Sequence, residues 1–132
     1  MYKSEDLRVK MMNWDELCGL ATTEIENTLE RLPDPLRERA AKLPVTFEKR
    51  PNLELQADGI EVDTLGLFVG PEMSEEEMVP MPSQIILFLE NLWEVAEGDQ
   101  KVFLEEVNTT FLHELGHFFG LDEDDLFDRG LE

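Results

Sequence analysis

Residues 111–124 read FLHELGHFFGLDED and contain the pattern H-E-x-x-H, formed by His113, Glu114 and His117. On a helix, positions four apart share one face, so the two imidazoles point the same way, one turn apart. Neutral imidazole binds Zn²⁺ at about 2.0–2.1 Å, and a catalytic zinc takes three protein ligands plus a water. The segment therefore predicts a helix that binds zinc through His113 and His117, with Glu114 placed as general base for the water.

The surroundings of this pattern favour a metal site over the alternative, in which both histidines are ordinary helix residues flanked by core aromatics. The chain has two histidines in all, and both lie in the pattern. Gly120 follows three residues after His117, and a helix commonly stops at such a glycine. The chain can then fold back and offer a third ligand from the acidic run Asp122, Glu123, Asp124 and Asp125.

Length and composition predict one globular domain over residues 1–132. The chain has 42% hydrophobic residues, and its 31 acidic and 11 basic residues give a formal charge of −20. This field repels phosphate backbones, so we expect no nucleic-acid partner. The basic residues cluster only weakly, and we interpret them as a solvated helix face; they are Arg37, Arg39, Lys42, Lys49 and Arg50.

The single cysteine, Cys18, excludes an internal disulfide and is interpreted as a small buried hydrophobe in an amphipathic helix. The first residues contain no apolar signal core, and no apolar run approaches the length of a membrane span. We therefore expect a cytoplasmic protein that does not contact membrane.

The first half of the chain predicts helices followed by strands. Apolar residues repeat at helical spacing over 14–32, with Asn13 as N-cap and Pro33 at the end. A short helix is expected over 36–42, and an alternating strand over 45–49. Residues 52–63 are ambiguous, 65–69 read as a second strand, and 71–82 read as a loop.

The second half predicts a buried strand over 84–89, a short helical turn over 91–96, and a long helix capped by Asp99. A last short helix is expected over 123–128. His113, Glu114 and His117 fall outside the apolar core stripe of the long helix and lie toward its open side. The core stripe comprises Val102, Phe103, Val107, Phe111, Leu115 and Phe118. The predicted fold class is α+β, with a three- or four-stranded mixed sheet packed on two long helices.

The motif H-E-L-G-H-F-F-G-L-D-E-D-D-L resembles the H-E-x-x-H-x-x-G-x-x-D signature of the minimal zincin-like metallopeptidases of bacteria. Weaker likenesses lie at 29–33, 65–70 and 82–88, so the resemblance spans roughly residues 14–127. It implies His113 and His117 as zinc ligands and Glu123 as the third ligand. Because the family has Asp where this chain has Glu123, Asp122 or Asp124 remain alternatives for that role.

The resemblance implies a zinc peptidase that hydrolyses peptide bonds of a peptide or protein substrate with a metal-activated water. Glu114 would accept the proton of the water and deliver it to the leaving amine. Two alternatives stand beside it: a non-catalytic, metal-stabilised interaction or regulatory module, and a metal-dependent endoribonuclease. The ribonuclease is disfavoured because the third histidine of the related helix is missing and the surface is acidic.

Overall fold

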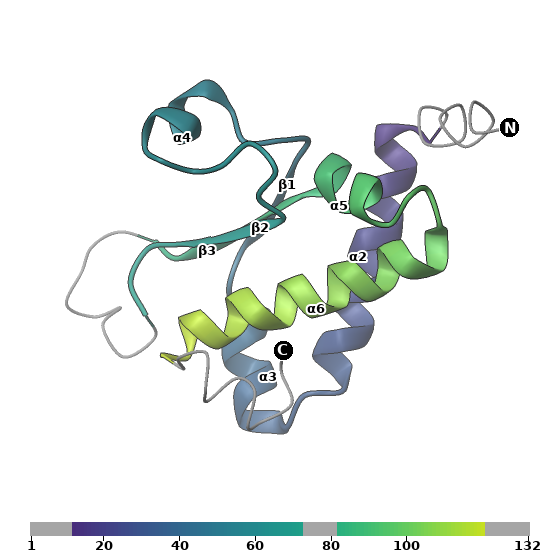
Figure 1. The fold of residues 1–132 in the computed structure, drawn as a ribbon. Coiled ribbons are helices and arrows are strands. Elements are labelled where there is room, and N and C mark those ends of the chain that lie inside the picture. Colours follow the sequence, from purple (N-terminus) through teal and green to yellow (C-terminus); the bar gives the residue numbers. More distant parts are fainter. Residues whose placement is uncertain (1–11, 73–81, 121–132) are drawn as a thin grey trace, which may run out of the picture.

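The protein is described here from a computed structural model, which places residues 12–72 and 82–120. The described helices and strands confirm the α+β class. Figure 1 shows helix α6 (Gln100–Phe118) running along a small sheet, with helix α2 (Trp14–Glu30) crossing α6. The remaining elements are helices α3 (Asp34–Ala41), α4 (Leu53–Ala57) and α5 (Leu89–Val95), and strands β1 (Val45–Glu48), β2 (Gly66–Val69) and β3 (Gln84–Phe88).

Within the described residues, the sheet has three strands in the order β1-β3-β2. Strand β1 is parallel to β3, with Val45 opposite Ile85. Strand β2 is antiparallel to β3, with Gly66 opposite Leu87 and Phe68 opposite Ile85. The sheet is therefore mixed, as predicted, and β2 forms one of its edges.

Strand β3 is buried on both of its faces, as its continuous apolar run predicts. Ile85 and Leu87 are fully buried on the face that packs into the main core, and Phe88 is equally buried on the opposite face. The strand ends one residue earlier than expected, because Leu89 already begins α5. Strand and helix are thus joined without a loop, so the sheet and α5 have little freedom to move apart.

Helix α2 begins where the sequence predicts. The Asn13 side chain accepts a hydrogen bond from the Glu16 backbone N–H at 2.8 Å, and the helix ends before Pro33. Leu17, Ala21 and Ile25 are its buried apolar residues and face the core. The next helix, α3, begins at Asp34, two residues before the expected start, with Pro35 in its first turn.

Helix α6 carries the predicted core stripe. Asp99 caps it by accepting a hydrogen bond from the Val102 backbone N–H at 3.1 Å. Of the six stripe residues, all but the half-buried Val102 are buried. A polar contact joins α6 to α2, since the Asn108 side-chain amide donates to the Thr28 hydroxyl at 2.6 Å.

The segments that the sequence left open or read as loops have mixed outcomes. The ambiguous stretch 52–63 contains the short helix α4, whose N-cap Asn52 accepts a hydrogen bond from the Leu55 N–H at 2.8 Å. The expected loop 71–82 is described only at its ends, where the Ser83 hydroxyl donates to the Pro71 carbonyl at 2.5 Å. The expected helix over 123–128 lies outside the described residues.

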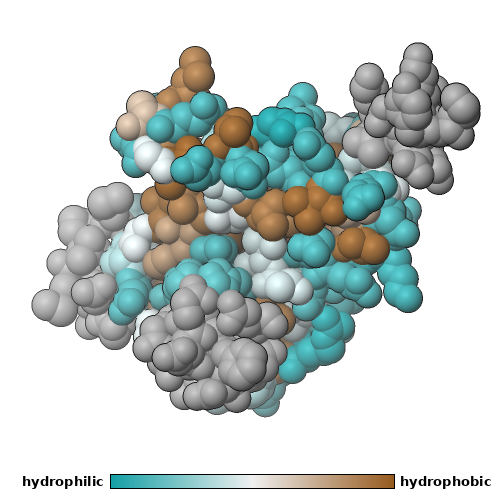
Figure 2. Space-filling model, in the orientation of Figure 1, coloured by the Kyte–Doolittle hydropathy of each residue, from teal (hydrophilic) through white to brown (hydrophobic). Residues whose placement is uncertain are grey.

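One face of the molecule combines hydrophilic and apolar surface. In Figure 2, hydrophilic residues cover much of the described part of this face, and hydrophobic residues form a band across its middle. Among the described residues, the large apolar side chains that are exposed to solvent are Leu53, Val62 and Val95.

Candidate metal centre

Helix α6 brings the two histidines together as the spacing predicts. The Nε2 atoms of His113 and His117 lie 3.1 Å apart, and the ring centroids lie 4.7 Å apart with the planes at 86°. Both side chains are half-buried, while their neighbours Leu115 and Phe118 turn into the core. The helix therefore anchors its apolar side and presents both imidazoles at the same place.

The separation of the two nitrogens fits zinc. Two ligands held about 2.0–2.1 Å from one tetrahedral zinc lie about 3.3 Å from each other. The observed 3.1 Å between the Nε2 atoms is close to this value, and neutral imidazole is a ligand that zinc favours. His113 and His117 can therefore serve as two ligands of one zinc ion without a change of backbone.

Glu114 lies where α6 passes closest to the edge strand. A Cβ atom placed on Gly66 would lie 2.5 Å from the Thr110 Cγ2 atom and 3.4 Å from the Glu114 Cγ atom. His113 and Glu114 also line an open hollow of about 300 Å³ between α6 and the start of β2, which we call the side pocket. Glu114 is thus next to both the imidazole pair and a space that a substrate can enter.

The predicted third metal ligand lies outside the described residues. Glu123, and its alternatives Asp122 and Asp124, lie in 121–132. Within residues 12–72 and 82–120, no group of three or more His, Cys, Asp or Glu side chains is arranged to hold a metal. The role of Glu123 therefore stays a prediction.

Helix α6 ends just before Gly120, as the sequence predicts. Gly120 has a φ of +80°, and its N–H donates to the His117 carbonyl at 3.0 Å. L side chains rarely adopt this conformation, so a glycine belongs here. A Cβ at Gly120 would also lie 3.3 Å from the Glu72 Oε1 atom, so one acidic side chain reaches the end of the metal-binding helix.

Cys18 takes no part in this site. It lies half-buried in α2 and packs against the core. Burial raises the pKa of its thiol, and the Asp15 carboxylate raises that pKa further. A thiol that stays protonated is a poor nucleophile, which agrees with its interpretation as a small apolar side chain.

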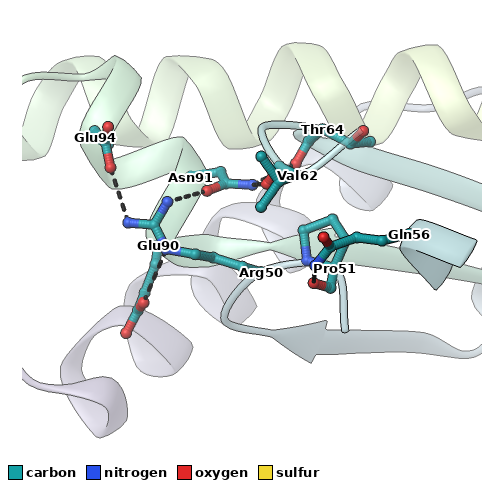
Figure 3. Close-up of polar contacts among 8 residues, drawn as sticks. All are labelled: Arg50, Pro51, Gln56, Val62, Thr64, Glu90, Asn91 and Glu94. Carbon is teal, nitrogen blue, oxygen red and sulfur yellow. Dashed lines mark hydrogen bonds and ion pairs between the residues drawn. The ribbon is translucent and has the colours of Figure 1, made fainter. Parts of the chain in front are cut away.

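A second polar cluster, which the sequence did not predict, holds the segment that enters β2 (Figure 3). The buried Asn91 side chain of α5 donates to the Val62 carbonyl at 2.8 Å and to the Thr64 carbonyl at 2.9 Å. Its Oδ1 atom accepts a hydrogen bond from Arg50 at 2.8 Å. Arg50 also pairs with Glu94 at 2.8 Å. This hydrogen bond is the main reason why the pKa of the Arg50 guanidinium is raised. We call this cluster the Asn91 anchor.

The structure corrects the interpretation of Arg50 as part of a solvated helix face: Arg50 is exposed, but it follows strand β1 and pairs with Asn91 and Glu94 of α5. No local pattern signals a contact between residues so far apart in sequence. Gly66 did carry a signal, since a glycine inside a strand often marks a close backbone approach. Thr110 and Glu106, which line the side pocket, carried none.

Comparison with known proteins agrees with the fold. The family model described as zincin-like metallopeptidase matches residues 40–131, which include all three strands and α6. The chain therefore belongs to the zincin-like metallopeptidase family. The expected likeness at 29–33 lies outside the matched range, and no curated protein matches the chain.

A membrane-spanning helix is not found in the described part of the chain, where every helix is too short or too polar to cross a bilayer.

Proposed function

We propose that this protein is a zinc-dependent peptidase in which His113 and His117 bind the metal and Glu114 is the general base. Glu123 is our choice for the third ligand. The observation that carries the proposal is the 3.1 Å approach of the two imidazole nitrogens on the open side of α6, beside a carboxylate that borders a substrate-sized hollow. Membership of a metallopeptidase family supports the same reaction class.

Zinc, when bound, supplies Lewis acidity and lowers the pKa of a coordinated water. Glu114 follows His113 directly in the sequence, so its carboxylate is on hand to take a proton from that water. The same carboxyl group then returns the proton to the amine that leaves. His113 and His117 would bind the metal through neutral imidazole rings.

The edge strand β2 offers a surface along which a peptide substrate can lie. The Phe88 backbone N–H donates to the Leu65 carbonyl at 3.0 Å. Because antiparallel pairs alternate, the backbone groups of Gly66 and Phe68 then face away from β3. Among the described residues, no strand pairs with this outer side of β2. An extended peptide that adds there as a further strand would pass close to Glu114.

The substitution Glu114→Gln tests the proposal. It removes the base but keeps the size of the side chain, so we expect zinc content to stay and peptide hydrolysis to fall by about 100-fold or more. Zinc is measured by elemental analysis on untagged protein, because a histidine tag binds metal itself. Hydrolysis is measured on casein and mixed peptides, with and without a chelator.

The matched control is Glu105→Gln, which makes the same change at an exposed position of α6 and should leave both quantities unaltered. Full hydrolysis by zinc-loaded Glu114→Gln protein contradicts the role of Glu114. A wild-type protein that binds zinc but cleaves no peptide favours the metal-stabilised interaction module instead. The cytoplasmic location stays a prediction.

A further inference from the structure

The side pocket continues the proposed active site along α6. Besides His113 and Glu114, its walls are Glu106, Thr109 and Thr110 of α6, facing Leu65 and Gly66 at the start of β2. Glu106, Thr110 and Glu114 are spaced at four residues, so they lie on one side of the helix. With a rise of 1.5 Å per residue, Glu106 lies about 12 Å along the axis from Glu114. A long side chain of a peptide bound beside Glu114 can therefore reach toward Glu106.

The chemistry of these walls is suited to a basic side chain. Leu65 gives one wall its apolar character, while Thr109 and Thr110 of α6 line the opposite side. Glu106 adds a half-buried carboxylate, and neither Lys nor Arg is among the described residues that line the pocket. Lys and Arg combine an aliphatic stem, which packs on apolar surface, with a cationic head that needs an acid. The charge of −20 on the whole chain also draws cationic peptides toward the protein.

The apolar wall of the pocket is held in place before any ligand arrives. The Asn91 anchor binds the Thr64 carbonyl at 2.9 Å, one residue before Leu65 (Figure 3). One residue further, Gly66 sits so close to Thr110 that an added Cβ would lie 2.5 Å from its methyl group. Because the wall is fixed at both of these points, it does not have to reorder when a substrate binds. A preformed wall favours selectivity between substrates.

We propose that the side pocket receives a lysine or arginine side chain of the substrate, and that Glu106 is the residue that selects it. This inference rests on the peptidase function proposed above and specifies the substrate class. Glu106 pairs with the cationic head, while the stem of the side chain packs along Leu65. Acidic side chains are rejected because Glu106 and Glu114 both repel them.

The test compares zinc-loaded wild-type, Glu106→Gln and Glu106→Lys proteins on three sets of quenched fluorescent peptides. The peptides of one set are identical except at a single residue near the cleavage site, and this residue is Lys or Arg, Met, or Glu. For wild type we expect kcat/KM to be about 5- to 20-fold higher with Lys or Arg than with Met. Glu106→Gln should lose this preference, and Glu106→Lys should turn it toward Glu. Glu105→Gln, an exposed change one residue away, should keep the wild-type preference.

Binding of the same peptides to zinc-loaded Glu114→Gln protein, measured by fluorescence anisotropy, separates this inference from the peptidase function. Cleavage without any preference for Lys or Arg overturns the inference and leaves the peptidase intact. Basic peptides that bind but are cleaved by no variant, with binding weakened by Glu106→Gln, support the pocket and overturn the peptidase. If binding is equal for Lys and Met peptides and is unaltered by Glu106→Gln, the inference is overturned, whether or not the peptides are cleaved.

Discussion

Gly66 is a residue at which the edge strand β2 and helix α6 are in close contact. The face of β2 that meets α6 carries Gly66 and Phe68, and the Phe68 ring lies 5.9 Å from the Phe118 ring. A large side chain fits at Phe68, where it packs on the end of α6. At Gly66 even a methyl group would collide with Thr110 and crowd Glu114. The size of one side chain thus sets the distance between the candidate base and the strand.

We expect Gly66→Ala to destabilise the fold by about 1–3 kcal/mol, which is typical of overpacking. Thr110→Ser removes the colliding Cγ2 atom, so the double variant should recover much of the lost stability, although the Leu87 Cδ2 atom at 3.2 Å also has to adjust. Urea unfolding measures the free energies. The control is Gly19→Ala in α2, where no atom lies within 4 Å of the added methyl and the helix should gain stability. A Gly66→Ala protein as stable as wild type would show that the strand and helix are not in close contact.

At the scale of elements, the Asn91 anchor joins α5, the end of β1 and the segment entering β2. Asn91 is 3% exposed, so its side-chain amide and the carbonyls that it binds are largely out of water. Buried polar groups that lose their partners cost far more than exposed ones. The segment that enters β2, next to one wall of the side pocket, is therefore held in part by a single amide of α5.

The substitution Asn91→Ala should lower the free energy of unfolding by about 2–3 kcal/mol, because it removes the hydrogen-bond partner of two carbonyls and of one N–H group of Arg50. We also expect kcat/KM to fall while zinc content is unaltered, since the histidines sit on a different helix. Denaturant unfolding, metal analysis and peptide cleavage measure the three quantities. Gln56→Ala removes a hydrogen bond of 2.9 Å from an exposed residue of the same region, and should change stability by less than about 0.5 kcal/mol. A comparable loss in both variants would mean that burial of Asn91 is unimportant.

At the scale of the whole molecule, metal binding and folding should be linked. The unfolded chain does not hold His113 and His117 at 3.1 Å, so zinc binds the folded state more tightly. A ligand at 100 times its Kd stabilises the folded state by about 2.7 kcal/mol, which corresponds to a rise in Tm of roughly 10 °C for a chain of this size. Such a gain matters in a small domain whose net stability is modest.

We expect zinc to raise the Tm of the wild type in calorimetry and to leave the Tm of His117→Ala unaltered. Glu123→Ala should reduce the shift if Glu123 is the third ligand, whereas Asp122→Ala and Asp124→Ala should not. A full zinc shift in all three acidic variants would place the third ligand elsewhere. A full shift in His117→Ala would exclude the histidine pair as the metal site.

Much of the fold and of the candidate site could be predicted because the signals are local. The Asn13 and Asp99 caps, the buried run of β3 and the positive φ of Gly120 each follow from residues within a few positions of one another. The geometry of the histidine pair is also set by a local signal, since it follows from one turn of a helix. By contrast, the third ligand depends on how the chain turns after Gly120, and Glu123 stays a prediction.

The amino-acid sequence alone predicted the helix that carries the histidine pair, the central strand and the family, because periodicity and motif spacing act within single elements. Only the tertiary structure decided that β2 lies against Glu114, that Asn91 holds the entry to β2, and that Glu106 shares a pocket with the candidate site. The physical reason is distance along the chain. Gly66 and Thr110 meet across 44 positions, as do Arg50 and Glu94, and such contacts arise from packing between elements, which no local pattern encodes.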